Sequence, residues 1–287
     1  MIAGVMTGLG VLAILAAAAG FGGAIHPLGD SLAVFQLPLA LTGMVMLMPA
    51  KRQWFWPAAI VGTMSMLNVL WPKMVPTAPG TYTVYQKNLS FRQHEQAELA
   101  ADILQRDTDI VTVQEVNEPN MAILEAIKAE YPTQAWCPFD FVGGTAVATK
   151  WSALGDVVCS DVGGLTALKV QSPSGPVWLV SLHLHWPWPF GQDAQIEALL
   201  PVLEGLDAPI VLGGDFNMVP WSNLVSRVME ASGTVYSGVR SPTYYIKEMV
   251  PIPIDHVLAG GGTGEVLPLL DSDHLGVLAQ VSLPPSR

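Results

Sequence analysis

Three long uncharged runs occupy the N-terminal quarter of the chain. Residues 1–21, 32–50 and 54–72 contain no Asp, Glu, Lys or Arg. As helices rising about 1.5 Å per residue, each would extend roughly 30 Å, the thickness of a bilayer's hydrocarbon core. As a helix, each run would be apolar on every face, whereas a helix that packs on a protein core usually has one apolar face. A cleaved signal peptide is the alternative for the first run, which lacks a positively charged start. The pattern predicts three transmembrane helices.

The few basic residues near these runs predict an orientation. Lys51 and Arg52 lie in the short connection between the second and third runs, whereas residues 26–31 contain no Lys or Arg. The positive-inside rule places this connection in the cytoplasm, although Lys73 opposes it weakly. We therefore expect a multi-pass cell-membrane protein whose C-terminal part is extracytoplasmic.

The pattern changes at about residue 74, where short apolar runs begin to alternate with one-sided helical periodicity. Strands are expected near residues 81–89, 109–116, 143–149, 165–171, 176–185, 209–216, 254–259 and 275–283. Helices are expected near residues 96–106, 121–131, 192–206 and 221–232. Strands with helices between them indicate a two-sheet core covered by helices. The predicted division is a membrane anchor, residues 1–73, and a second domain, residues 74–287.

Composition and charge restrict the classes of substrate that the protein could bind. The chain is 51% hydrophobic and 13% charged, against about 25% charged in ordinary soluble domains. Residues 74–287 hold 10 basic and 23 acidic side chains, a formal charge of −13. Proteins that grip duplex nucleic acid usually present a basic surface, because phosphate contacts supply most of the affinity. The charge therefore disfavours a dedicated duplex-DNA enzyme, but not one acting on a small or zwitterionic phosphoester.

The two cysteines, Cys137 and Cys159, form no CxxC motif and no Cys/His cluster, which argues against structural zinc. Two buried thiols are the commoner arrangement, and a disulfide is the alternative in an oxidising compartment.

Polar residues gather at the ends of the expected strands. A turn explains any one of them, but eight that are rich in carboxylate, amide and imidazole indicate a shared site. Carboxylates suit Mg²⁺, and imidazole can carry a proton or a positive charge beside a phosphoryl group. The eight are Asn88, Glu115, His183, Asp215, Asn217, Asp255, Asp273 and His274.

These residues lie in "KNLS", "VQEV", "SLHLHWP", "GGDFNMVP", "IDHVL" and "SDHLGV". The succession resembles the endonuclease/exonuclease/phosphatase superfamily, which includes DNase I-like nucleases, inositol polyphosphate phosphatases and neutral sphingomyelinases. The resemblance covers nearly all of residues 80–283 and excludes the three N-terminal runs. It implies an α/β fold, a four-layer α/β/β/α sandwich of the DNase I type, here expected after three transmembrane helices. It also implies phosphoester hydrolysis by an activated water attacking in line.

The resemblance assigns the metal to three residues. Glu115 is expected to be the main ligand of Mg²⁺, with Mn²⁺ as the alternative ion. Asn88 would support the metal or Asp215, and Asp273 would complete the metal site. Ser90 stands where several nucleases have an acidic or amide residue, which weakens the expected metal support there.

The resemblance also assigns the catalytic roles. Asp215 would orient and deprotonate the attacking water, and Asn217 would hold Asp215 and the phosphate in register. His183 matches the family's phosphate-side position. His274 would contact the phosphate and be oriented by Asp255, as a carboxylate–imidazole pair.

An aromatic segment follows the "HLH" motif, with Trp186, Trp188 and Phe190 beside His185. It is either a packed Pro-rich loop or a surface that touches lipid, because Trp favours the membrane interface. His185 is expected to support the site rather than react.

The resulting hypothesis is a membrane-anchored, Mg²⁺-dependent phosphoesterase acting on a lipid headgroup or small phosphodiester, with the bilayer as partner. The alternatives are an extracytoplasmic nuclease acting on nucleic acid and a non-catalytic binding module on the same fold. The sequence leaves the oligomeric state open.

Overall fold

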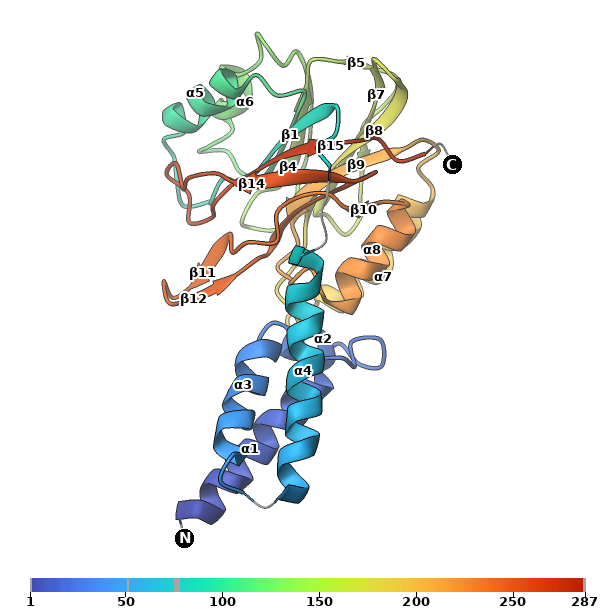
Figure 1. The fold of residues 1–287 in the computed structure, drawn as a ribbon. Coiled ribbons are helices and arrows are strands. Elements are labelled where there is room, and N and C mark those ends of the chain that lie inside the picture. The colour runs from blue at the N-terminus through green and yellow to red at the C-terminus, as the bar shows by residue number, and fades with distance from the viewer. Residues whose placement is uncertain (1, 51, 75–77, 286–287) are drawn as a thin grey trace. The chain divides into compact units, whose positions relative to one another are not determined.

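The computed structural model describes residues 2–50, 52–74 and 78–285 (Figure 1). The chain forms two compact units, each of which combines three separate segments. The first unit comprises Met1–Pro76, Trp186–Asp193 and Met218–Ser226, and the second comprises Thr77–His185, Ala194–Asn217 and Arg227–Arg287.

The N-terminal part of the first unit is helical. Its helices are α1 (Ile2–Ala19), α2 (Leu28–Ala33), α3 (Gln36–Leu47) and α4 (Arg52–Met74). Ile14 of α1, Leu47 of α3 and Ala58 of α4 are buried against one another. Gln36 is also fully buried, and its amide oxygen accepts a hydrogen bond from Asn68 Nδ2 at 2.9 Å. Apolar contacts and this amide pair therefore join α1, α3 and α4.

The prediction of three transmembrane helices is contradicted. Among the described residues, no helix combines the length and the apolarity needed to cross a bilayer. The second apolar run is divided between α2 and α3, and the 12 residues of α3 would span only about 18 Å at 1.5 Å per residue. The expected multi-pass localisation and extracytoplasmic placement are contradicted with it. Lys51, on which the orientation partly rested, lies outside the described residues.

Two loops of the first unit contact the segment around α2. Asp30 accepts hydrogen bonds from the backbone N–H groups of Asn223 (2.8 Å) and Leu224 (3.2 Å), the first residues of α8 (Asn223–Ser232). The carbonyl of Trp188 accepts a hydrogen bond from the Ser31 hydroxyl at 2.9 Å, and the Trp188 ring lies 5.7 Å from the His26 ring. The aromatic loop is thus tied to residues 26–31, while the Trp188 side chain stays 40% exposed.

Asp30 supplies the cap for α8 from almost 200 residues away in the sequence. We expect Asp30→Ala to lower the free energy of unfolding by about 1–2 kcal/mol, because two helix N–H groups lose their acceptor. Asp30→Asn keeps an oxygen acceptor and should recover at least half of the loss. Urea unfolding of the three proteins measures both effects, and an unchanged midpoint in Asp30→Ala would show that the cap contributes nothing.

The second unit contains two mixed β-sheets. The six-stranded sheet has the order β14 (Gly262–Val266), β15 (Val277–Val281), β1 (Tyr82–Asn88), β2 (Ile110–Val116), β4 (Gly144–Thr149) and β3 (Thr133–Cys137). The seven-stranded sheet runs β10 (Val235–Tyr236), β13 (Asp255–Ala259), β9 (Ile210–Asp215), β8 (Gly175–His183), β7 (Leu165–Ser172) and β5 (Ser152–Ala153), and β6 (Val158–Cys159) also pairs with β7. A separate hairpin pairs β11 (Tyr244–Ile246) with β12 (Val250–Ile252).

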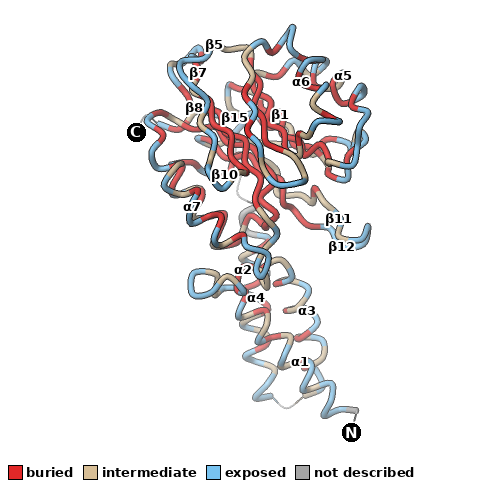
Figure 2. Tube along the Cα trace, turned by 180° about the vertical axis from the view of Figure 1, so that it is seen from behind, coloured by how far each residue is buried: buried red, intermediate tan, exposed pale blue. Residues whose placement is uncertain are grey.

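The sheets pack face to face, and helices cover their outer faces. Val84 and Ile110 of the six-stranded sheet share a buried cluster with Leu179 and Val211 of the seven-stranded sheet. Figure 2 shows that the central strands are largely buried. Helices α5 (Ala97–Arg106) and α6 (Ala122–Ala126) bury apolar side chains on the outer face of the first sheet. Helices α7 (Gln192–Glu204) and α8 lie beside the second sheet (Figure 1). The predicted four-layer α/β/β/α sandwich is confirmed.

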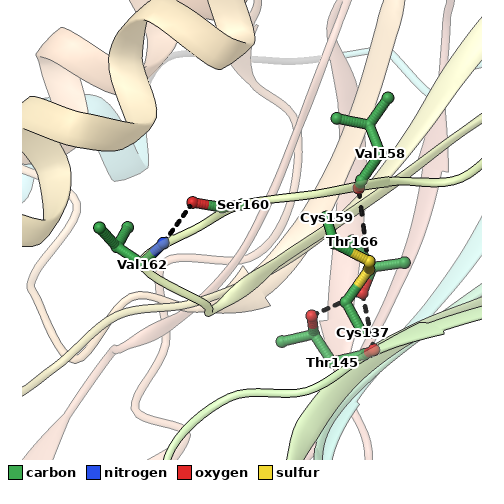
Figure 3. The surroundings of a disulfide bond; sticks show 7 residues. All are labelled: Cys137, Thr145, Val158, Cys159, Ser160, Val162 and Thr166. Atoms are coloured by element: carbon green, nitrogen blue, oxygen red, sulfur yellow. Dashed lines mark hydrogen bonds between the residues drawn. A yellow bond between two sulfur atoms is a disulfide. The ribbon is translucent and has the colours of Figure 1, made fainter.

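A disulfide joins Cys137, the last residue of β3, to Cys159 in β6 (Figure 3). The sequence favoured two buried thiols, and that expectation is wrong. Beside the disulfide, the Thr166 hydroxyl donates to the Thr145 carbonyl at 2.7 Å, which links β7 to β4. Both bonds connect the two sheets at one end of the sandwich.

Candidate active site

Three of the predicted site residues form one row across the seven-stranded sheet. Asp215 at the end of β9 pairs with His183 of parallel β8 on one side and with Asp255 of antiparallel β13 on the other. All three are at least nine-tenths buried. Sheet register alone therefore places an imidazole and two carboxylates side by side.

The six-stranded sheet supplies Asn88 and Glu115 from the ends of parallel β1 and β2. A bulge between Gln114 and Val116 leaves Glu115 with a positive φ of 59°, which turns its side chain out of the regular alternation. The Asn88 Nδ2 group donates to Glu115 Oε1 at 3.1 Å and to Asp215 Oδ2 at 3.0 Å. One amide thus joins carboxylates from the two sheets.

Charge is distributed unequally between the two histidines. His274 Nδ1 lies 3.0 Å from Asp255 Oδ2, and its Nε2 lies 3.8 Å from Asp215 Oδ2. Burial alone would lower the pKa of His274, but the Asp255 and Asp215 carboxylates outweigh it and raise the pKa to about 10. The Asp255 pKa is lowered: burial would raise it, and the His274 charge and hydrogen bond prevail. His274 is therefore a cation at neutral pH.

His183 behaves in the opposite way. Burial, followed by the positive charge of His274, lowers the pKa of His183 to about 3. Its Nε2 lies 3.6 Å from Asp215 Oδ2 and 3.9 Å from Glu115 Oε1. Its Nδ1 is buried and has no hydrogen-bond partner among the described residues. His183 is neutral at physiological pH.

The pKa values of the two neighbouring carboxyl groups are raised. Burial raises the pKa of Asp215 to about 7 against the opposing charge of His274, and the Asn217 N–H donates to Asp215 Oδ1 at 2.9 Å. Burial also raises the pKa of Glu115, although the Phe91 N–H donates to its Oε2 at 2.6 Å. A group with a pKa near 7 can act as a general base under physiological conditions.

The structure also places the last two predicted residues. Asn217 has a positive φ of 47°, and its Nδ2 donates to the Leu184 carbonyl at 2.8 Å, which fixes the loop after β9 to the end of β8. Asp273 is exposed, unlike the other seven, and lines a cavity with Tyr244 and Lys247. Seven of the eight predicted side chains thus converge, and Asp273 lies at their edge.

Comparison with known proteins agrees with this geometry. The sequence model of the Endonuclease/Exonuclease/phosphatase family matches residues 85–274, about two thirds of the chain, and includes every site residue described above. The chain belongs to this family. It is therefore an enzyme, a metal-dependent hydrolase of phosphoesters. No curated protein is similar enough in sequence to count as a match.

Solved structures share the fold of this family member. TDP2 from Caenorhabditis elegans is 16% identical over 69% of this chain and 96% of its own, with a TM-score of 0.56. Sphingomyelinase C from Streptomyces griseocarneus is 16% identical over 72% and 100%, with a TM-score of 0.51. A variant of beta toxin from Staphylococcus aureus, solved with bound magnesium ions, is 13% identical over 70% and 99%, with a TM-score of 0.52. At these identities the likeness shows the fold alone.

The donor set fits the metal dependence of the family. Asp215 is buried and Glu115 is mostly buried; their carboxylates share the Asn88 amide, and burial raises both of their pKa values. A divalent cation between them would offset the cost of burying negative charge. Asn88 turns its amide nitrogen to both carboxylates, while its oxygen accepts from the Ser90 N–H at 2.9 Å. This orientation favours support of the carboxylates over direct ligation.

A second group of donors is less suited to a metal. The atoms of Asp215, Asp255 and His274 lie within 4.8 Å of one another. Asp255 already forms an ion pair with His274, and a charged imidazole cannot ligate a metal. Glu115 with Asp215 is therefore the better candidate.

Sequence reasoning missed the buried polar residues that form hydrogen bonds to the site residues and between the strands that carry them. Gln86 Nε2 donates to Asp255 Oδ1 at 3.2 Å and to Gln114 Oε1 at 2.7 Å. Gln114 in turn donates to the Ser181 hydroxyl of β8 at 3.0 Å. This buried chain of amides links the catalytic strands of the two sheets.

Lys87 was missed as well, although it stands next to Asn88. It is fully buried, and its Nζ donates to the carbonyls of Leu269 and His274 at 2.6 Å each. Burial lowers the pKa of Lys87 to about 8 despite the attraction of Asp255. A Lys directly before the polar end of a strand was the available signal. Lys87 fixes the loop that carries His274.

Proposed function

We propose that the chain hydrolyses a small phosphodiester, or the headgroup ester of a lipid, with Mg²⁺ as the metal. The observation on which this rests is the position of Asp215, whose carboxylate lies between a neutral and a charged histidine, 3.6 Å and 3.8 Å away. A base next to a fixed cation suits a reaction in which water attacks an anionic phosphorus centre. The magnesium ions bound to the beta toxin variant of the same fold support the choice of metal.

Each side chain has a distinct proposed part. Asp215 accepts the proton of the attacking water, and Asn217 holds the carboxylate through its N–H. His274, oriented by Asp255, binds a non-bridging phosphate oxygen as a cation, and His183 faces the same carboxylates in the neutral form. Glu115 and Asp215 would hold the Mg²⁺, with Asn88 supporting them and Asp273 reaching in from the edge. Mg²⁺ would stabilise negative charge on the phosphoryl oxygens.

The charge of the second unit supports a small substrate over a polynucleotide. Residues 74–287 carry 23 acidic and 10 basic side chains. A long polyanion would be repelled by such a surface, whereas one diester group needs only His274 and the metal. The sphingomyelinase C of the same fold acts on a phosphodiester of this class by name.

Hydrolysis by the purified full-length chain tests the proposal. Para-nitrophenyl diesters, sphingomyelin vesicles, phosphatidylinositol vesicles, single-stranded DNA and duplex DNA are offered in parallel with Mg²⁺. We expect small diesters or vesicle lipid to be cleaved and DNA to be spared. Cleavage of DNA with the other substrates untouched would overturn the proposed substrate class.

Removal of the metal is expected to abolish turnover. EDTA should reduce hydrolysis to background, and added Mg²⁺ should restore it, because the ion that Glu115 and Asp215 would hold would supply the positive charge that stabilises the phosphoryl oxygens. Mn²⁺ and Ca²⁺ added in the same titration compare other divalent ions. Undiminished hydrolysis in EDTA would contradict the metal assignment.

A further inference from the structure

A cavity of about 370 Å³ opens next to the site and is not used by the mechanism above. Residues 138–140 form one wall, residues 160–163 form the other, and His185 completes the lining. All of them belong to the second unit. The cavity is large enough for a substituent of several heavy atoms beyond the phosphate.

The two walls are held together by covalent and steric means. Cys137 and Cys159 directly precede the two wall segments, and their disulfide sets the Cα atoms 5.6 Å apart (Figure 3). Gly163 has a φ of +71°, and a Cβ there would lie 2.6 Å from the Phe139 ring. A larger residue at position 163 would therefore displace Phe139. Glycine at position 163 therefore allows the Phe139 ring to lie in the cavity wall.

Phe139 connects the cavity to the catalytic residues. Its ring centroid lies 5.3 Å from that of His183 and 5.0 Å from that of His185. His183 faces Asp215 and Glu115 through Nε2. A substrate with its phosphate between His183 and His274 could therefore extend a short substituent along Phe139 into the cavity.

The lining selects the charge of that substituent. Asp140 and Asp161 contribute two carboxylates, and the lining contains no Lys or Arg. A second phosphate or a sugar–phosphate chain would be repelled here. A positively charged group would be attracted by the carboxylates and by the face of the aromatic ring.

We propose that this cavity, lined by Phe139, Asp140, Asp161 and His185, binds the cationic end of a zwitterionic phosphodiester. The ligand class is an ammonium group joined to the phosphate by a short carbon chain. The inference rests on the proposed function, because it specifies the substituent carried by the diester. It also gives the Cys137–Cys159 disulfide a role in substrate recognition.

Binding and turnover test the proposal separately with the full-length protein. Calorimetry compares phosphocholine with the isostere in which an uncharged quaternary carbon replaces the ammonium nitrogen. Kinetics compares para-nitrophenyl phosphorylcholine with bis-para-nitrophenyl phosphate. The proteins compared are the wild type, the double variant Asp140→Asn with Asp161→Asn, and Asp156→Asn, which changes an exposed carboxylate outside the lining.

We expect wild type and Asp156→Asn to bind phosphocholine about tenfold or more tightly than the isostere, and the double variant to lose that preference. In the double variant, the kcat/KM for para-nitrophenyl phosphorylcholine should decrease by a similar factor, while the kcat/KM for bis-para-nitrophenyl phosphate stays unchanged. Equal binding of phosphocholine and isostere by wild type would overturn the cationic subsite, even if diesters are hydrolysed. Selective binding without hydrolysis of either ester would leave the subsite standing and overturn the proposed function.

Discussion

Asp215→Asn is expected to lower kcat/KM for a phosphodiester by about 10²–10⁴, the usual contribution of a positioned general base. The amide has the same shape as the carboxylate but cannot accept the proton of water. The Asn217 N–H and Asn88 Nδ2 groups, which now donate to the two carboxylate oxygens, would meet only one acceptor. The lost acceptor should lower stability slightly, but because the side chain keeps its shape we expect a folded protein whose main defect is in the chemical step.

The measurement must separate lost chemistry from weakened metal binding. Rates are determined over a wide range of Mg²⁺ concentration, because Asp215 is also proposed to hold the ion. A defect that persists at saturating Mg²⁺ identifies the base, whereas full recovery at high Mg²⁺ assigns Asp215 to the metal alone. Asp156→Asn, at an exposed position, is the matched control. Activity within threefold of wild type at every Mg²⁺ concentration would overturn the mechanism.

The sandwich was predictable because its signals are local. Alternating or continuous apolar runs end on polar residues, and in β8, β9 and β13 those ends became the row His183, Asp215 and Asp255. The motif order pointed to the same positions. Register between strands then determined which polar ends meet, and no single segment contains that information.

The supporting residues were not predictable, because composition does not show which polar residues are buried. Gln86 and Gln114 resemble ordinary polar positions of alternating strands, yet both lie between the sheets at zero exposure. The positive φ of Glu115 depends on a bulge against β4, which only pairing reveals. Phe139 gained its position through Gly163 and the disulfide, two contacts between distant segments.

The prediction of three transmembrane helices failed because hydropathy alone does not show where a helix begins and ends. The run 32–50 is interrupted between α2 and α3, where Val34 and Phe35 belong to neither helix. Asp30 is the single acidic residue of the first 73, and no role was predicted for it from the sequence. It is 7% exposed and caps a helix far along the sequence.

Asp255→Asn is expected to change the pH dependence of catalysis as well as its rate. In the wild type, Asp255 and Asp215 raise the pKa of His274 to about 10, so the imidazole stays charged throughout the neutral range. Removing the Asp255 carboxylate takes away the largest attraction that opposes burial and leaves that of Asp215, so the pKa of His274 should fall. A histidine is charged below its pKa, so the variant should lose activity at a lower pH than the wild type as pH rises.

The expected defect is therefore small in acid and large in base. The wild-type imidazole stays mostly charged up to a pH of about 10, whereas the variant imidazole loses its charge at a lower pH. Activity of Asp255→Asn relative to wild type should thus fall progressively between neutral pH and pH 9, beyond any loss seen near pH 6. The profiles are measured at one saturating Mg²⁺ concentration, with Asp102→Asn as control, because Asp102 also accepts hydrogen bonds but from Tyr85 and Arg106 away from the site. A uniform loss at every pH would mean that Asp255 only orients His274, whereas a displaced alkaline limb shows that the charge on His274 is what the phosphate requires.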